Sequence, residues 1–133
     1  MIVVDTSVLI AFLKGARTPA AERFARIEED EIPFAIPVVC FQELLQGARD
    51  GREWRVLDEY LASQRLLKPE DPLDLHREAA RIFFDGRRRG LTIRSTVDCL
   101  IAAQTLRAGG TLLHDDNDFD HIAKIRPLKT ARG

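Results

Sequence analysis

Short apolar runs of strand length alternate with longer segments of helical period along most of the chain. Residues 2–4 are β-branched, whereas residues 74–89 carry apolar positions three and four apart, as in an amphipathic helix. We expect strands at residues 2–4, 34–36, 65–68, 111–114 and 126–129. We expect helices at residues 8–14, 19–29, 38–48, 54–64, 74–89, 97–106 and 119–123. This alternation predicts an α/β fold with a mostly parallel central sheet of four to five strands and helices on both faces.

Several residues predict where these elements begin and end. Thr6 and Ser7 are expected to cap the first helix, which ends at Gly15. Pro37 suits the first position of the third helix, because the N–H that proline lacks would have no helical partner there. Only residues 130–133 are expected to be frayed.

Length and composition predict one domain. A chain of 133 residues can bury roughly two-thirds of its unfolded surface around a single core, so residues 1–133 are expected to form one unit. Cys40 and Cys99 lie in apolar runs without metal-ligand spacing, which predicts buried free thiols in a reducing compartment. The start has no signal-peptide pattern, and no stretch is apolar enough to span a membrane. We therefore expect a cytoplasmic protein without membrane contact.

The overall charge gives no sign of nucleic-acid binding. The net charge of −1 and a pI near 6.3 differ from the basic character of proteins that bind phosphates through bulk charge, so any such binding must be local. Arg87, Arg88 and Arg89, together with Arg94, form the best local patch for RNA phosphates. The arginine triplet could equally complement the dipole of a helix end. Further basic candidates are Lys14, Arg17, Arg49, Arg52 and Arg55.

Carboxylates stand where two of the expected parallel strands end. Asp5 directly follows the first strand, and the acidic run 115–118 directly follows the fourth. Ligands of open parallel sheets bind beyond such carboxyl ends. Asp98, in the first turn of a helix, can face the same edge, and Glu43 is a fourth candidate. Carboxylates brought together repel one another, so a cluster implies bound metal, and oxygen ligands favour Mg²⁺ or Mn²⁺.

Each acid also has a structural interpretation. Asp5 could cap the first helix. Ser95 and Asp98 match the S-x-x-D capping box, so Asp98 could serve only that role. Glu43 could simply be solvated on the polar side of its helix. The pattern leaves open which acid of residues 115–118 turns inward, because it does not fix the residue at which the strand ends.

Four segments in register resemble the acidic elements of PIN domains. They are VVDTSVLI (3–10), FQEL (41–44), VDCLIAA (97–103) and LLHDDNDF (112–119). The segment LTIRSTVDCLIAA (91–103) resembles VapC toxins of VapBC toxin–antitoxin systems in particular. The matches run in order across nearly the whole chain. The chain is therefore identified as a candidate member of this family, with a PIN-like three-layer fold expected.

The resemblance implies an endoribonuclease that depends on Mg²⁺ or Mn²⁺. Its catalytic acids would be Asp5, Glu43, Asp98 and Asp116, of which the metal ligands would be Asp5, Asp98 and Asp116. Thr6 or Ser7 matches a hydroxyl that supports the metal site in the family. Asp118 would then cap the following helix, and His114 would be a neighbour of the site and not a ligand.

The resemblance also implies partners. These are an RNA substrate, a VapB-type antitoxin that blocks the acidic site, and a second copy of the chain, with DNA contacted only through the antitoxin. Two sets of apolar side chains could form the antitoxin groove or a dimer surface, or could belong to the core. One set is Phe12, Leu13, Phe24 and Ile27, and the other is Leu44, Leu45, Trp54 and Leu57.

Three other kinds of acidic site fit the sequence less well. A receiver-like phosphoacceptor domain has an Asp pair after its first strand and a Lys at a late strand end, whereas Asp5 stands alone and Lys124 and Lys129 are poorly placed. A haloacid-dehalogenase-like phosphatase has the motif D-x-D after its first strand, whereas Asp5 is followed by Thr6 and Ser7. An EF-hand has Gly at the position where this chain has His121. The remaining rival is a catalytically inactive PIN-like domain that only binds RNA or protein. The presence of all four acids argues against it.

Overall fold

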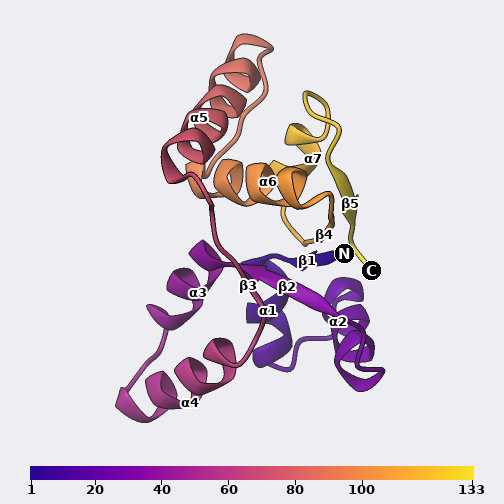
Figure 1. The fold of residues 1–133 in the computed structure, drawn as a ribbon. Coiled ribbons are helices and arrows are strands. Elements are labelled where there is room, and N and C mark those ends of the chain that lie inside the picture. The colour runs from indigo at the N-terminus through magenta and orange to yellow at the C-terminus, as the bar shows by residue number, and fades with distance from the viewer.

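The computed structural model describes residues 1–133 as a sheet of strands with helices on both sides (Figure 1). The five strands are all parallel and lie in the order β3-β2-β1-β4-β5. They are β1 (Ile2–Val4), β2 (Phe34–Pro37), β3 (Leu66–Leu67), β4 (Thr111–Leu113) and β5 (Lys129–Ala131). The predicted α/β class with a parallel central sheet is therefore confirmed.

Seven helices cover the sheet. They are α1 (Thr6–Leu13), α2 (Pro19–Glu29), α3 (Val38–Leu45), α4 (Gly51–Ala62), α5 (Pro72–Arg88), α6 (Thr96–Ala108) and α7 (Asn117–Ile122). In Figure 1, α5, α6 and α7 lie above the strands, and α1, α2 and α4 lie below them. None of the helices combines the length and the apolar character that crossing a lipid bilayer requires.

The middle strands are apolar on both faces because helices cover both faces. Val3 and Val4 of β1 point to opposite faces, and both are fully buried in a cluster of 24 apolar residues. Phe24 of α2 meets the ring of Phe12 edge-on at a centroid distance of 4.9 Å and the ring of Phe34 at 5.1 Å. These contacts fix α2 against α1 and the sheet. The two cysteines are also buried and unpaired, as predicted.

Close approach explains the glycine pair that ends α6. Gly109 adopts φ 63°, a left-handed conformation that residues with a Cβ rarely adopt. A Cβ on Gly110 would lie 2.9 Å from the Val3 Cγ2 atom and 3.2 Å from the Met1 carbonyl oxygen. These two glycines therefore allow the chain to turn tightly from α6 into β4.

α3 begins at Val38 as predicted, but two assignments at helix starts are wrong, because the last residue of the preceding strand, or the one directly after it, takes the capping position. Asp5, not Thr6 or Ser7, caps α1: its backbone is still extended (φ −80°, ψ 157°), and its side chain accepts a hydrogen bond from the Ser7 N–H. Pro37 ends β2 and immediately precedes the first residue of α3. Each helix therefore begins directly where its strand ends.

The C-terminal strand lies later than predicted. β5 spans Lys129–Ala131 instead of residues 126–129, and Thr130 is not frayed but pairs with Leu112. The His114 N–H donates a further hydrogen bond to the Ala131 carbonyl oxygen at 3.0 Å. Pro127 lacks an N–H and suits the start of an edge strand better than its interior, which moves the pairing toward the C-terminus.

The parallel topology brings the carboxyl ends of β1, β2 and β4 to one edge of the sheet. Asp5 follows β1, α3 begins directly after β2, and the turn beginning at His114 follows β4. α6 contacts β2, α3, β4 and α7, so its first turn reaches the same edge. The segments that carry the candidate acids therefore meet there.

Candidate metal centre

Asp5 is held by the residue two positions after it. It is only 3% exposed, and its Oδ2 atom accepts hydrogen bonds from the Ser7 N–H at 3.0 Å and from the Ser7 hydroxyl at 2.5 Å. The Ser7 Oγ atom in turn accepts a hydrogen bond from the Asp115 N–H at 3.0 Å. Ser7 thus links the turn after β1 to the turn after β4.

Glu43 is held by the other hydroxyl of the same turn. The Thr6 hydroxyl donates to the Glu43 Oε1 atom at 2.7 Å, and Thr6 is only 8% exposed. The two hydroxyls that the sequence could not distinguish therefore contact different acids. Glu43 is not simply solvated, because this contact fixes it beside Asp5.

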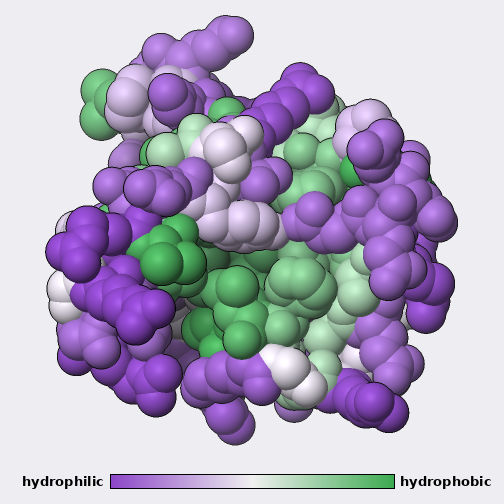
Figure 2. All heavy atoms as spheres, turned by 90° about the horizontal axis from the view of Figure 1, so that it is seen from below, coloured by the Kyte–Doolittle hydropathy of each residue, from purple (hydrophilic) through white to green (hydrophobic).

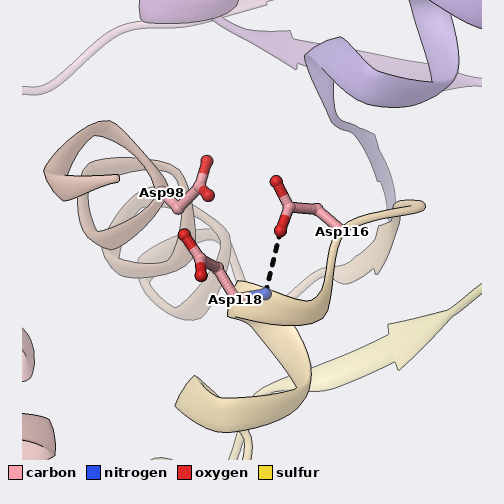
Figure 3. Close-up of side chains that lie close together, drawn as sticks. All are labelled: Asp98, Asp116 and Asp118. Atoms are coloured by element: carbon pink, nitrogen blue, oxygen red, sulfur yellow. Dashed lines mark hydrogen bonds between the residues drawn. The ribbon is translucent and has the colours of Figure 1, made fainter. Parts of the chain in front are cut away.

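A second group of acids comes from α6 and α7. One side-chain oxygen each of Asp98, Asp116 and Asp118 lies within 4.8 Å of the others, and Figure 3 shows the three side chains converging. Asp116 caps α7 by accepting from the Asp118 N–H at 2.9 Å. Asp5 is not among these three, but its charge contributes to the raised pKa of Asp98.

The structure corrects which acid caps α7: Asp116 caps it and also remains in the acidic group, whereas Asp118 lies within the helix. Asp118, expected to cap α7, instead points back and accepts from the Arg94 N–H at 3.0 and 3.1 Å and from the Ser95 N–H at 2.9 Å. This bond replaces the predicted capping box, since Ser95 makes no side-chain cap hydrogen bond and its N–H goes to Asp118 instead of Asp98. Sequence reasoning missed Asp118 as a member of the cluster, because its partners are 23 and 24 residues away.

The pKa values of the acids separate into two kinds. Burial raises the pKa of Asp5 to about 6, and the charge of Glu43 contributes to the increase. Burial also raises the pKa of Asp98 to about 9, with further contributions from a hydrogen bond to Asp118 and from the charge of Asp5. Although burial acts to raise the pKa of Asp118 as well, the hydrogen bonds that it accepts hold that pKa below its usual value of 3.8.

Two buried carboxylate oxygens have no hydrogen-bond partner. They are Asp5 Oδ1 and Asp98 Oδ2. An unpaired buried polar atom costs about 1 to 3 kcal/mol, and more when the group is charged. Such oxygens can serve as cation ligands, and a nearby divalent cation would favour the ionised form of both carboxyls. Because the surrounding ligand atoms are also carboxylate oxygens, the residues fit a hard cation such as Mg²⁺ or Mn²⁺.

His114 positions an acid. It is fully buried, its ring packs edge-on against Phe119 at 5.1 Å, and its Nδ1 atom accepts a hydrogen bond from the Asp116 N–H at 3.1 Å. Burial lowers the pKa of His114, which favours the neutral ring that can accept this bond. Its contact is thus to the backbone of Asp116, beside the acidic group.

A polar cavity of about 900 Å³ adjoins the acids. No hydrophobic residue lines it; its lining residues are Thr92, Arg94, Asp115, Asp116, Asn117, Asp118, Asp120, His121, Lys124 and Arg132. Arg132 is a feature that the sequence did not reveal. It donates to Asp115 at 2.9 Å and to Asn117 and Asp120 of α7 at 2.8 and 2.5 Å, and so connects the C-terminal segment to α7 and the turn before it.

Of the predicted basic patch, only Arg94 lines this cavity. Arg87 lies over the Phe83 ring at 5.9 Å, and Arg88 lies over the Phe84 ring at 5.6 Å. Arg89 donates to the Lys124 carbonyl oxygen at 3.2 Å. None of these three side chains lines the cavity, although Arg89, which follows α5, contacts the backbone of the lining residue Lys124.

Sequence comparison adds a family. A sequence model of the PIN domain matches residues 2–125, which include every candidate acid. VapC ribonuclease Mb1587 of Mycobacterium bovis (strain ATCC BAA-935 / AF2122/97) is 36% identical over 134 residues, and the alignment covers 98% of both proteins. Ribonuclease VapC11 of Mycobacterium tuberculosis (strain CDC 1551 / Oshkosh) has the same identity and coverage.

Solved structures share the fold. VapBC-1 from nontypeable Haemophilus influenzae matches with a TM-score of 0.72 and 19% identity, covering 98% of this chain and 97% of that chain. VapBC2 from Rickettsia felis, solved bound to a DNA fragment from its promoter, matches with a TM-score of 0.72 and 17% identity, covering 98% of both chains. At these identities the likeness shows the fold alone.

Proposed function

This chain belongs to the PIN domain family, and from that premise we propose that it is a metal-dependent endoribonuclease and the toxin of a VapBC-type toxin–antitoxin pair. The full-length similarity to VapC ribonucleases supports RNA as the substrate. The observation that carries the metal dependence is the pair of buried, unpartnered oxygens on Asp5 and Asp98. Cation ligation would give these oxygens the partner that no hydrogen-bond donor of the protein supplies.

Three carboxylates would hold the cation, Mg²⁺ or Mn²⁺. They are Asp5, Asp98 and Asp116. When bound, the cation would lower the pKa of a water molecule and offset the negative charge that builds up on the phosphate during hydrolysis. Ser7 fixes Asp5 through its Oδ2 atom and leaves Oδ1 available as a ligand. Asp118 holds the segment before α6 against α7, which keeps Asp98 beside Asp116.

Glu43 would orient the attacking water. Its Oε1 atom is occupied by the Thr6 hydroxyl, and its Oε2 atom makes no hydrogen bond within the protein. That second oxygen can accept a hydrogen bond from water next to Asp5. His114 would keep Asp116 in place through the backbone N–H of that residue.

RNA cleavage is the direct test of this proposal. We expect the parent protein to cut a structured RNA pool with Mg²⁺ or Mn²⁺ and not with chelator, and Asp98→Asn to reduce cleavage by roughly 100-fold or more. Asp58→Asn is a matched control, because Asp58 is an exposed acid on α4 without a hydrogen-bond partner. Cleavage by Asp98→Asn at the parent rate would exclude this site. RNA binding without cleavage by either protein would favour the inactive, binding-only alternative.

An apolar hollow supports the antitoxin partner. Figure 2 shows it on the face seen from below, where α1, α2 and α4 lie in Figure 1. Ile10 and Leu13 of α1 and Trp54 of α4 are 39%, 45% and 47% exposed, although each is a large apolar side chain. Phe24, Ile27, Leu44 and Leu45 of the two predicted sets are buried in the core instead. A VapB-type antitoxin would cover the hollow and present an arginine to the acids.

The same proposal includes the setting of the protein. Residues 1–133 would act as one PIN-like domain in the cytoplasm, with a second copy of the chain as a further partner. DNA would be contacted through the antitoxin. Replacing Leu13 or Trp54 by Glu is expected to weaken antitoxin binding and to leave RNA cleavage unchanged, because neither residue lines the polar cavity.

A further inference from the structure

Basic side chains line the polar cavity beside the acids, and some of them already form hydrogen bonds within the protein whereas others do not. The Arg132 guanidinium donates to three acceptors, Asp115 before α7 and Asn117 and Asp120 within it. The His121 Nδ1 atom lies 2.8 Å from the Thr92 carbonyl oxygen, and because a carbonyl only accepts, the ring must donate there. The Nδ1 N–H of His121 is therefore committed to the protein backbone. Arg94 and Lys124 remain, and neither side chain forms an ion pair or hydrogen bond within the protein.

The Arg94 and Lys124 side chains lie close to the acids, both in sequence and in the fold. The Arg94 N–H donates to Asp118, whose carboxylate lies within 4.8 Å of Asp98 and Asp116. Lys124 follows closely after the helix that Asp116 caps, and its N–H donates to the His121 carbonyl oxygen at 3.1 Å. Asp116, Asp118, Arg94 and Lys124 all line the same cavity. One bound molecule can therefore contact acids and cations together.

The cavity favours a strongly polar ligand. Its volume of about 900 Å³ is in the range of ligand pockets, yet no hydrophobic residue lines it, which disfavours an apolar molecule. An exposed arginine and an exposed lysine without acidic partners are suited to a phosphate, the arginine through its fork of donors and the lysine as a point charge. With a net charge of −1, the chain gains RNA affinity only from such local groups.

We propose that Arg94 and Lys124 form a subsite for a backbone phosphate of the RNA, adjacent to the phosphate that is cleaved at the acids. The inference rests on the proposed ribonuclease function and names how that site holds its substrate. The subsite binds RNA through its backbone and does not read base identity. The arginines at residues 87–89 are not part of this subsite, since their side chains do not line the cavity.

A charge-matched pair of double variants tests the subsite. Arg94→Gln/Lys124→Gln removes two positive charges from the cavity, and Arg26→Gln/Lys129→Gln removes two from exposed positions outside it. We expect the cavity variant to raise KM roughly tenfold with kcat within about twofold, because uniform substrate binding is lost. RNA affinity, measured in an Asp98→Asn background with Mg²⁺, should show a salt dependence less steep by about 0.7 in log–log slope, as for one lost phosphate contact. The control pair should retain the parent values, and melting curves verify that all variants are folded.

The outcomes separate this inference from the proposed function. If the parent cleaves RNA and the cavity variant matches the control in KM and in salt slope, the subsite is wrong and the nuclease proposal stands. If the parent does not cleave RNA but the cavity variant still loses RNA affinity relative to the control, the nuclease proposal is wrong and the phosphate subsite stands.

Discussion

Two carboxylates that lie within 4.8 Å of each other are held in opposite ways. Asp118 and Asp98 are similarly buried, at 3% and 6% exposed. Asp118 accepts hydrogen bonds from the backbone N–H groups of Arg94 and Ser95, which hold its pKa low. Asp98 has one oxygen without a partner and a pKa of about 9. Two acids of similar exposure thus differ in pKa because backbone N–H groups donate hydrogen bonds to one of them and not to the other.

The difference indicates two roles. A carboxylate that accepts hydrogen bonds from backbone N–H groups stabilises the fold whether or not a cation is present. An acid without donors is destabilising when ionised, unless a cation takes the place of the missing donors. Asp5 belongs to the second kind, although Ser7 satisfies one of its oxygens.

The largest expected effect is the pH dependence of the metal-free protein. A raised pKa means that the acid binds its proton more tightly in the folded state than in the unfolded state. The contribution of each such acid to stability is therefore fully present below pH 3.8 and is lost as the pH rises through the folded-state pKa. Stability in chelator should therefore fall from about pH 4 to about pH 9, through both acids up to about pH 6 and through Asp98 alone above it. The shift of Asp5 from 3.8 to about 6 alone corresponds to about 3 kcal/mol.

Denaturant unfolding in chelator across this range measures the effect. The lowered pKa of Asp118 acts in the opposite direction, but only below pH 3.8, where its protonation weakens the fold. A stability that stays level or increases between about pH 5 and pH 8 in the absence of metal would contradict the account.

Asp118→Ala should destabilise the fold, whereas Asp98→Ala should not. Removing Asp118 leaves the part-buried N–H groups of Arg94 and Ser95 without their acceptor and should lower the free energy of unfolding by about 2 to 3 kcal/mol. Removing Asp98 at about pH 8 in chelator removes a buried carboxyl group with an unpartnered oxygen and should leave stability unchanged or increased. Urea unfolding of both variants measures the difference, and two equal losses of stability would show that the acids are held alike.

Thr6 offers a smaller and sharper test, because it supplies a donor to a catalytic candidate. Thr6→Val keeps the shape of the side chain and removes the hydrogen bond to Glu43, so cleavage should fall roughly fivefold while stability changes by about 1 kcal/mol. Thr6→Ser keeps the hydroxyl and should cleave like the parent. Rate measurements on both variants suffice. Equal rates for Thr6→Val and Thr6→Ser would mean that Glu43 does not need this donor.

The alternation of strands and helices made the fold predictable, and the carboxyl ends of the strands indicated where the acids gather. The division of labour among the acids was not predictable. A cap at Asp118 is a reasonable local interpretation, but the interaction that decides its role pairs it with Arg94, 24 residues earlier. Thr6 and Ser7 are adjacent and chemically alike, and only the tertiary structure assigns Glu43 to one and Asp5 to the other. Likewise, the three consecutive arginines at residues 87–89 favoured the wrong basic segment, because Lys124 lines the cavity and those arginines do not.

The central claim is that the unpartnered oxygens of Asp5 and Asp98 are ligands of a divalent cation. Thermal unfolding at about pH 8 tests this claim most directly. Adding Mg²⁺ or Mn²⁺ to the parent at about 100 times its dissociation constant should stabilise the fold by about 2.7 kcal/mol, seen as a higher melting temperature. The same addition should barely change Asp98→Asn, which lacks one ligand carboxylate. A parent protein that melts at the same temperature with and without the cation, or an Asp98→Asn variant that gains as much as the parent, would contradict the account.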